Sequence, residues 1–83
     1  MTIDFHLYQQ YLLEYLHLAI CESDGSNRGI YERLSEIQVH GRFVRHRSEK
    51  QRALEDAQRA FDEHRHWPRE IVLKQLGVNL SDI

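Results

Sequence analysis

The chain is poor in the residues that cross-link or interrupt small domains. Its 83 residues include one cysteine, Cys21, one proline and four glycines. A single cysteine cannot form an internal disulfide, which favours a reducing, cytoplasmic setting. With so little proline and glycine, a collagen-like or proline-rich chain is excluded. We therefore interpret the composition as that of an ordinary globular domain.

Long apolar runs are also missing. No stretch approaches the roughly 18 apolar residues that a membrane-spanning helix requires. The first residues, Met1-Thr2-Ile3-Asp4, form neither a basic leader nor the apolar core of a signal peptide. These two observations predict a cytoplasmic protein that does not associate with membranes.

The short length limits what the fold can enclose. We expect residues 1–83 to form a single small helical domain, which buries only about 60% of the surface of its unfolded chain. Little room remains for an enclosed substrate pocket. The sequence also offers no convincing nucleophile with its base, glycine-rich phosphate loop or acidic dyad. We therefore expect no enzymatic activity and no cofactor.

The first helix is expected over residues 4–21. At 100° per residue its inner face is apolar, and this face comprises Phe5, Tyr8, Leu12, Tyr15, Leu16 and Ala19. Further apolar residues flank it, namely Leu7, Tyr11 and Leu18 on one side and Leu13 and Ile20 on the other. An apolar surface covering about 240° of a helix needs cover from two directions. We therefore predict a homodimer, with Leu7, Tyr11 and Leu18 in the contact.

The second element allows two interpretations. Residues 22–27 are rich in turn formers, and Ser26 or Asn27 is suited to cap the next helix. A four-and-three spacing then predicts a helix that continues to residue 44, with a seam of Ile30, Leu34, Ile37, Gly41 and Val44. The alternation of apolar and polar residues over 37–44 also permits a short hairpin that turns at His40-Gly41.

A third helix is expected over residues 48–66, capped by Ser48. Its inward seam is rich in alanine, which lets another helix approach closely, and comprises Lys50, Ala53, Leu54, Ala57, Ala60, Phe61 and His64. Pro68 begins a fourth helix that ends at Leu76, with Gly77 in the left-handed conformation and Val78 against Leu73. The predicted fold is all-α, a helical hairpin or small bundle of three to four helices.

Two groups of side chains could carry chemistry. Glu14, His17 and Cys21 lie on adjacent turns of one helix face with spacings that a metal could use. Because this strip is also the only solvated face of the first helix, we favour no metal. His40, His46, His64 and His66 could form a pH switch, and packed or exposed imidazoles without that role are the simpler interpretation.

Charge is unevenly distributed along a chain whose net charge is −2. Residues 42–52 hold Arg42, Arg45, Arg47, Lys50 and Arg52 against Glu49 alone. We expect a non-enzymatic adaptor, inhibitor or regulator that binds a larger protein through Arg42, Arg45 and Arg47 or through the flanks of the first helix. The alternative is a small nucleic-acid-binding transcriptional regulator that uses the same basic stretch. Its weakness is that Phe43 is the only aromatic residue there to stack on a base.

Overall fold

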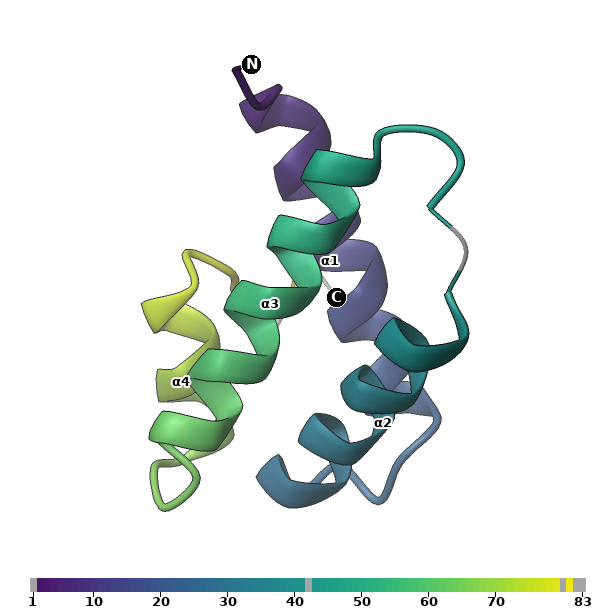
Figure 1. Cartoon of the computed structure of the whole chain (residues 1–83). Helices are drawn as coiled ribbons and strands as arrows, with labels where there is room; N and C mark the ends of the chain where they lie inside the picture. The colour runs from purple at the N-terminus through teal and green to yellow at the C-terminus, as the bar shows by residue number, and fades with distance from the viewer. Residues whose placement is uncertain (1, 42, 80, 82–83) are drawn as a thin grey trace.

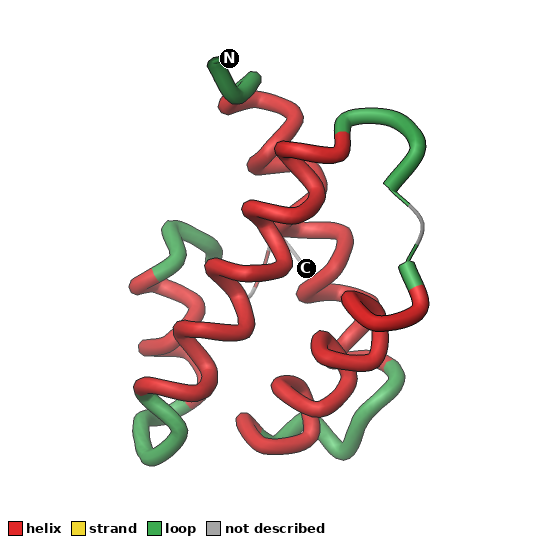
Figure 2. The backbone as a smooth tube through the Cα atoms, in the orientation of Figure 1, coloured by secondary structure: helices red, strands yellow, loops and turns green. Residues whose placement is uncertain are grey.

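A computed structural model describes residues 2–41, 43–79 and 81 of the chain. It contains the helices α1 (Phe5–Cys21), α2 (Asn27–His40), α3 (Arg47–Glu63) and α4 (Arg69–Gln75). Figure 2 shows helices joined by loops, and no strand occurs among the described residues. The all-α prediction is confirmed, with a compact arrangement of four helices.

Helix α3 is the central element of this arrangement, because it contacts each of the other three helices. In Figure 1, α1 and α3 run side by side in the same direction, α2 runs in the opposite direction, and α4 lies on the far side of α3 from α2. The small side chains of Ala53, Ala57 and Ala60 are buried along α3. Alanine lets neighbouring helices approach closely, so its repetition explains how a single helix packs against three others.

The core combines residues from every helix, and its buried side chains are Leu12, Leu16, Ala19, Ile30, Leu34, Ala53, Leu54, Ala57, Ala60, Phe61, Val72, Leu73 and Val78. The expected inner face of α1 is confirmed for Leu12, Leu16 and Ala19. Tyr8 and Tyr15 are half-buried and pack against this core. Phe5 was expected to be inward, but its side chain is 66% exposed.

Both interpretations of residues 37–44 need correction. Helix α2 ends at His40, and Gly41 continues in an extended conformation with φ −72° and ψ 139°. Residues 43–46 form neither helix nor strand. Val44, expected in the seam of a longer helix, is therefore 86% exposed.

The boundaries of α3 also differ from those expected. The helix begins at Arg47, and the residue that precedes it is His46, with φ 53° and no side-chain capping bond. Ser48 consequently lies inside the first turn and is not the cap. At the other end the helix stops at Glu63, so His64 and His66 lie in the turn that leads to α4.

The end of α4 has the expected structure. Gly77 has φ +78°, which glycine adopts without the penalty that other residues incur. Its amide donates to the Lys74 carbonyl, and the Val78 amide donates to the Leu73 carbonyl, both at 2.9 Å. These two bonds are those of a Schellman motif, and they return Val78 to the core.

Among the residues that the structure describes, no helix has both the length and the apolar character needed to cross a membrane.

Candidate protein-interaction surfaces

The last turn of α2 and the segment that joins α2 to α3 carry the most exposed large apolar side chains of the described chain. Val39 in the last turn of α2 is 77% exposed, and Val44 in the connection is 86% exposed. Arg45 and Arg47, two of the expected partner-binding residues, are also exposed and follow Val44 directly. We call Val39, Val44, Arg45 and Arg47 the valine–arginine surface. Arg42, the third expected arginine, lies outside the described residues.

This surface has one sign of charge. The sequence from Ile37 to Ser48 contains no Asp or Glu. In the described part of the chain, the ion pairs involve Arg28, Arg33 and Arg52. Among the described residues, neither Arg45 nor Arg47 forms an ion pair, and both side chains are exposed.

The start of α3 is unfavourable for a helix terminus in three respects. His46 adopts positive φ, which costs energy for a residue with a Cβ, and it makes no side-chain capping bond. The helix then begins with Arg47 and has Lys50 at its fourth position, with Glu49 as the one acidic residue of this turn. Cations at a helix N-terminus oppose the positive end of the helix dipole.

A contact with α1 holds this unfavourable start in place. The Tyr11 hydroxyl lies 2.7 Å from Nδ1 of His46. The two rings are 5.9 Å apart, and Nζ of Lys50 lies 5.1 Å from the Tyr11 ring centroid. Tyr11 was expected to face a second copy of the chain, but it instead packs against the core and the start of α3.

The other two residues expected in a dimer contact differ from Tyr11. Leu7 is half-buried, whereas Leu18 is 37% exposed near the opposite end of α1. Tyr11, which is half-buried, already contacts His46, so only part of its side chain is open to a second copy. The flank of α1 is therefore a weaker candidate surface than its sequence indicates.

A second apolar surface lies beside the first turn of α1. A hollow of about 450 Å³, lined by Thr2, Ile3, Phe5, Tyr8, Arg52 and Asp56, opens between this turn and α3. The Phe5 ring stacks on Tyr8 at 5.8 Å between centroids. We call this feature the N-terminal hollow. Sequence analysis missed it because Phe5 has the helical position of a core residue.

A hydrogen bond fixes the floor of the N-terminal hollow. The Tyr8 hydroxyl donates to Oδ2 of Asp56 at 2.6 Å, and Nε of Arg52 lies 3.6 Å from the same oxygen. Burial, followed by the bond to Asp56, raises the pKa of Tyr8 well above its ordinary value. Tyr8 therefore keeps its proton and acts as a donor at neutral pH.

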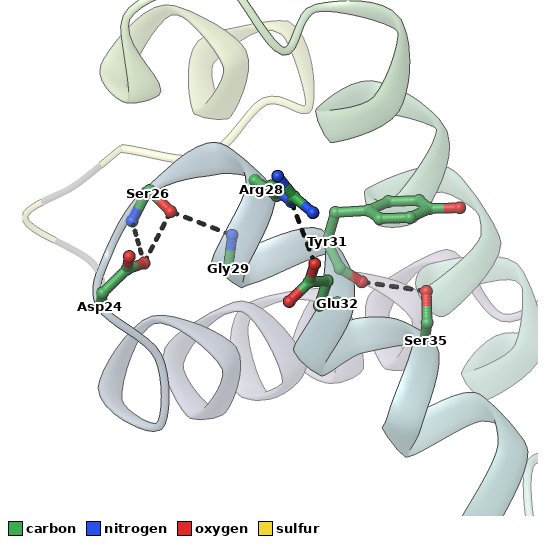
Figure 3. A network of polar contacts seen from close by, with 7 residues as sticks. All are labelled: Asp24, Ser26, Arg28, Gly29, Tyr31, Glu32 and Ser35. Carbon is green, nitrogen blue, oxygen red and sulfur yellow. Dashed lines mark hydrogen bonds and ion pairs between the residues drawn. The ribbon is translucent and has the colours of Figure 1, made fainter.

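The turn between α1 and α2 is a third polar region, shown in Figure 3. The Ser26 hydroxyl donates to Oδ1 of Asp24 at 2.6 Å and accepts from the Gly29 amide at 3.0 Å. Ser26 is therefore the cap of α2, as its sequence position predicts. On the adjoining face, Arg33 pairs with Glu22 and Glu36. These side chains are paired within the chain, although Nε of Arg33 is buried without a partner among the described residues, so folding accounts for most of the region.

The residues considered for metal binding are brought only partly together. Nε2 of His17 lies 3.7 Å from Sγ of exposed Cys21. No group of three or more His, Cys, Asp or Glu side chains in the described ranges is arranged to hold a metal ion.

The histidines are spread over the molecule. His40 is exposed at the end of α2, and His46 contacts Tyr11. His64 stacks on Trp67 at 3.8 Å in the turn between α3 and α4. Because these rings lie in separate places, the structure does not gather them into one cluster.

Comparisons with protein families, curated proteins and solved structures found no match for this chain. Function is therefore argued from the surfaces themselves.

Proposed function

We propose that the protein is a non-enzymatic protein-binding module that engages a larger acidic protein through the valine–arginine surface, as an adaptor, inhibitor or regulator. The observation that carries this proposal is the exposure of Val39 and Val44 in the same stretch of sequence as Arg45 and Arg47, which form no ion pair among the described residues. Such a mixture of apolar and cationic groups matches a partner surface that presents apolar side chains among carboxylates.

The energetics favour a partner at this place. Burying a valine side chain contributes about 1.5 kcal/mol or more, so the two valines can supply a substantial part of an affinity. The arginines increase the rate of encounter with an acidic surface and select against basic ones. In the free protein, the same groups contribute nothing evident to the fold.

A protein partner is favoured over nucleic acid by the position of Phe43. This ring is half-buried and packs against the core, so it is not free to stack on a base. Two exposed valines would add little to a contact made with phosphates. The nucleic-acid regulator is therefore the alternative outcome of the test below.

Two further parts of the proposal concern the protein's state in the cell. We propose that it acts in the cytoplasm, which suits a chain whose one cysteine, Cys21, is free and exposed. We also propose that it forms a homodimer, since it leaves several large apolar side chains exposed on a small domain.

Photo-crosslinking in the native cell tests the partner proposal. A photoreactive amino acid in place of Val44 should yield one dominant protein adduct, to be identified by mass spectrometry. The matched control is the same amino acid in place of Ile71, an exposed apolar residue of α4 on the other side of α3. An adduct of equal yield at both positions, or one with RNA or DNA, would contradict the proposal.

Binding to the identified partner gives the quantitative test. The double substitution Arg45→Glu with Arg47→Glu should raise the dissociation constant at least about tenfold, since each change opposes acidic groups on the partner. Thermal unfolding should change little, because both arginines are exposed. Binding unaffected by the double substitution would remove the arginines from the interface.

A further inference from the structure

The N-terminal hollow shares no residue with the valine–arginine surface, and its central feature is the exposed ring of Phe5. Phe5 lies on the same side of α1 as the buried Leu12 and Leu16, because the three share one helical stripe. Its side chain is nevertheless 66% exposed. The first turn of α1 projects past the elements that cover the rest of the stripe, as Figure 1 shows.

The exposed aromatic ring is continuous with other apolar groups. Ile3 is exposed beside it, and Tyr8 forms a stacked pair with it over the floor of the hollow. An aromatic ring that fills a pocket is the usual centre of a protein contact, because its large rigid surface is buried at little entropic cost. The hollow of about 450 Å³ is large enough to receive one such side chain.

The charges around the hollow indicate which partner fits. On its α3 side, Arg52 and Asp56 lie one helical turn apart and pair with each other at 3.6 Å, so the edge of the hollow carries an exposed cation next to the half-buried carboxylate that accepts from Tyr8. In a two-fold symmetric contact, residue i of one copy meets residue j of the other and the reverse. Arg52 of each copy can then face Asp56 of the other, and the rim is complementary to itself.

The valine–arginine surface lacks this property. Its charged residues, Arg45 and Arg47, are both cationic, so two copies facing each other there would repel. Of these two surfaces, the N-terminal hollow is the one that suits an identical partner.

We infer that a second copy of this chain docks on the N-terminal hollow, with Phe5 of each copy inserted against Phe5, Tyr8 and Ile3 of the other. This inference rests on the proposed homodimer and gives it a surface different from the Leu7, Tyr11 and Leu18 flank. It is independent of the acidic partner, because the valine–arginine surface remains free in such a dimer.

Sedimentation equilibrium from low to high micromolar concentration provides the test. The wild-type protein should shift from monomer to dimer as concentration rises. Phe5→Ser should raise the dimer dissociation constant at least about tenfold, since it removes the central aromatic group. Val44→Ser is the matched control: it removes an exposed apolar group from the other surface and should leave self-association unchanged.

A charge substitution tests the self-complementary rim and also serves if Phe5→Ser fails to fold. Arg52→Glu should weaken the dimer, because it places a carboxylate at position 52 of each copy against Asp56 of the other. Arg28→Glu is its control, since Arg28 also pairs with a carboxylate four residues later, Glu32, at an exposed place away from the hollow. Circular dichroism should show unchanged helix content in both variants.

The outcomes separate this inference from the broader proposal. A dimer that survives Phe5→Ser and Arg52→Glu but is lost with Leu18→Ser would overturn the inference and preserve the dimer. A monomer at every concentration would overturn both. Neither result bears on crosslinking at Val44, which tests the acidic partner separately.

Discussion

Two connections of similar length join the first three helices, and they are built in opposite ways. The α1–α2 turn satisfies its polar groups: Asp24 accepts from Ser26, and Ser26 caps α2. The α2–α3 connection exposes Val44, starts α3 without a side-chain cap and begins that helix with Arg47. Folding alone accounts for the first connection, whereas the second retains residues that folding does not require.

This difference has a general physical meaning. Sequences tend to be locally consistent with their folds, and departures concentrate at sites selected for another purpose. The α2–α3 connection departs in its cap, its charges and its exposed valines at once. Because these departures lie close together, we propose a binding role for the α2–α3 connection and a purely structural role for the α1–α2 turn.

The largest expected effect on stability comes from a substitution in the α1–α2 turn. Gly25 has φ +82°, and a Cβ there would lie 3.0 Å from Nη1 of Arg69, which donates to the Gly25 carbonyl. We expect Gly25→Ala to lower the free energy of unfolding by about 2 kcal/mol, measured by chemical denaturation.

Gly77→Ala is the control for that substitution. Gly77 has a similar φ of +78°, but a Cβ there would meet nothing within 4 Å. It should cost only about 1 kcal/mol, the penalty of the left-handed conformation alone. Equal losses at the two positions would show that the Arg69 contact adds nothing to the turn.

The caps of α2 and α3 give the second comparison. Ser26→Ala removes the side chain that accepts from the Gly29 amide, and should lower the free energy of unfolding by about 1 kcal/mol. Ser48→Ala should change it by less than about 0.5 kcal/mol, because Ser48 is exposed inside α3 and caps nothing. A large loss at Ser48 would mean that Ser48 is the cap and that α3 begins at Glu49, two residues later than Arg47.

A smaller effect should have the opposite sign in the α2–α3 connection. Arg47→Glu replaces a cation by an anion at the first residue of α3, which should stabilise the protein by about 0.5 kcal/mol at low salt. The gain should shrink as salt is added. The same variant should bind the acidic partner more weakly, so stability and binding change in opposite directions.

Arg45→Glu is the control for the helix effect, because Arg45 lies outside α3. It should weaken binding without the gain in stability. If Arg47→Glu destabilised the protein, the arginine would have a structural role and the contrast between the two connections would fail.

The smallest expected effect is on how stability depends on pH. Hydrogen bonds from the side chain and the backbone of Ser26 lower the pKa of Asp24 from its ordinary value of 3.8. A carboxyl whose pKa is lower in the folded state stabilises that state above its unfolded pKa, and this contribution disappears as the pH falls through the folded pKa. Thermal stability should therefore fall less on acidification below about pH 4 in Asp24→Asn than in the wild type. Parallel pH profiles would contradict this assignment.

Local signals in the sequence predicted several elements correctly. Ser26 before α2 and Gly77 after α4 act through bonds to backbone groups only a few residues away. The stripe that includes Leu12 and Leu16 has helical spacing, which identifies the buried face of α1 without knowledge of its neighbours. Such features depend on sequence separation and could be predicted for that reason.

Predictions that required knowledge of neighbours were less accurate. Val44 continues the seam of α2 in sequence, but the helix ends at His40 and leaves it in solvent. Ser48 has the chemistry of a cap, yet α3 starts at Arg47. Tyr11 lies on the flank of α1, and its environment depends on the approach of His46, which is 35 residues further along the chain.

The sequence by itself determined that this protein is all-α, that a cap at Ser26 or Asn27 precedes α2, and which stripe of α1 is buried. Helical periodicity and capping are local properties of the chain. The tertiary structure alone decided that Tyr11 supports the start of α3 while Phe5 remains exposed beside a hollow. Both residues are aromatic and lie on one helix, with similar local preferences. Their different surroundings depend on where α3 begins and how far α1 projects past it, and such long-range packing is not encoded in any short segment.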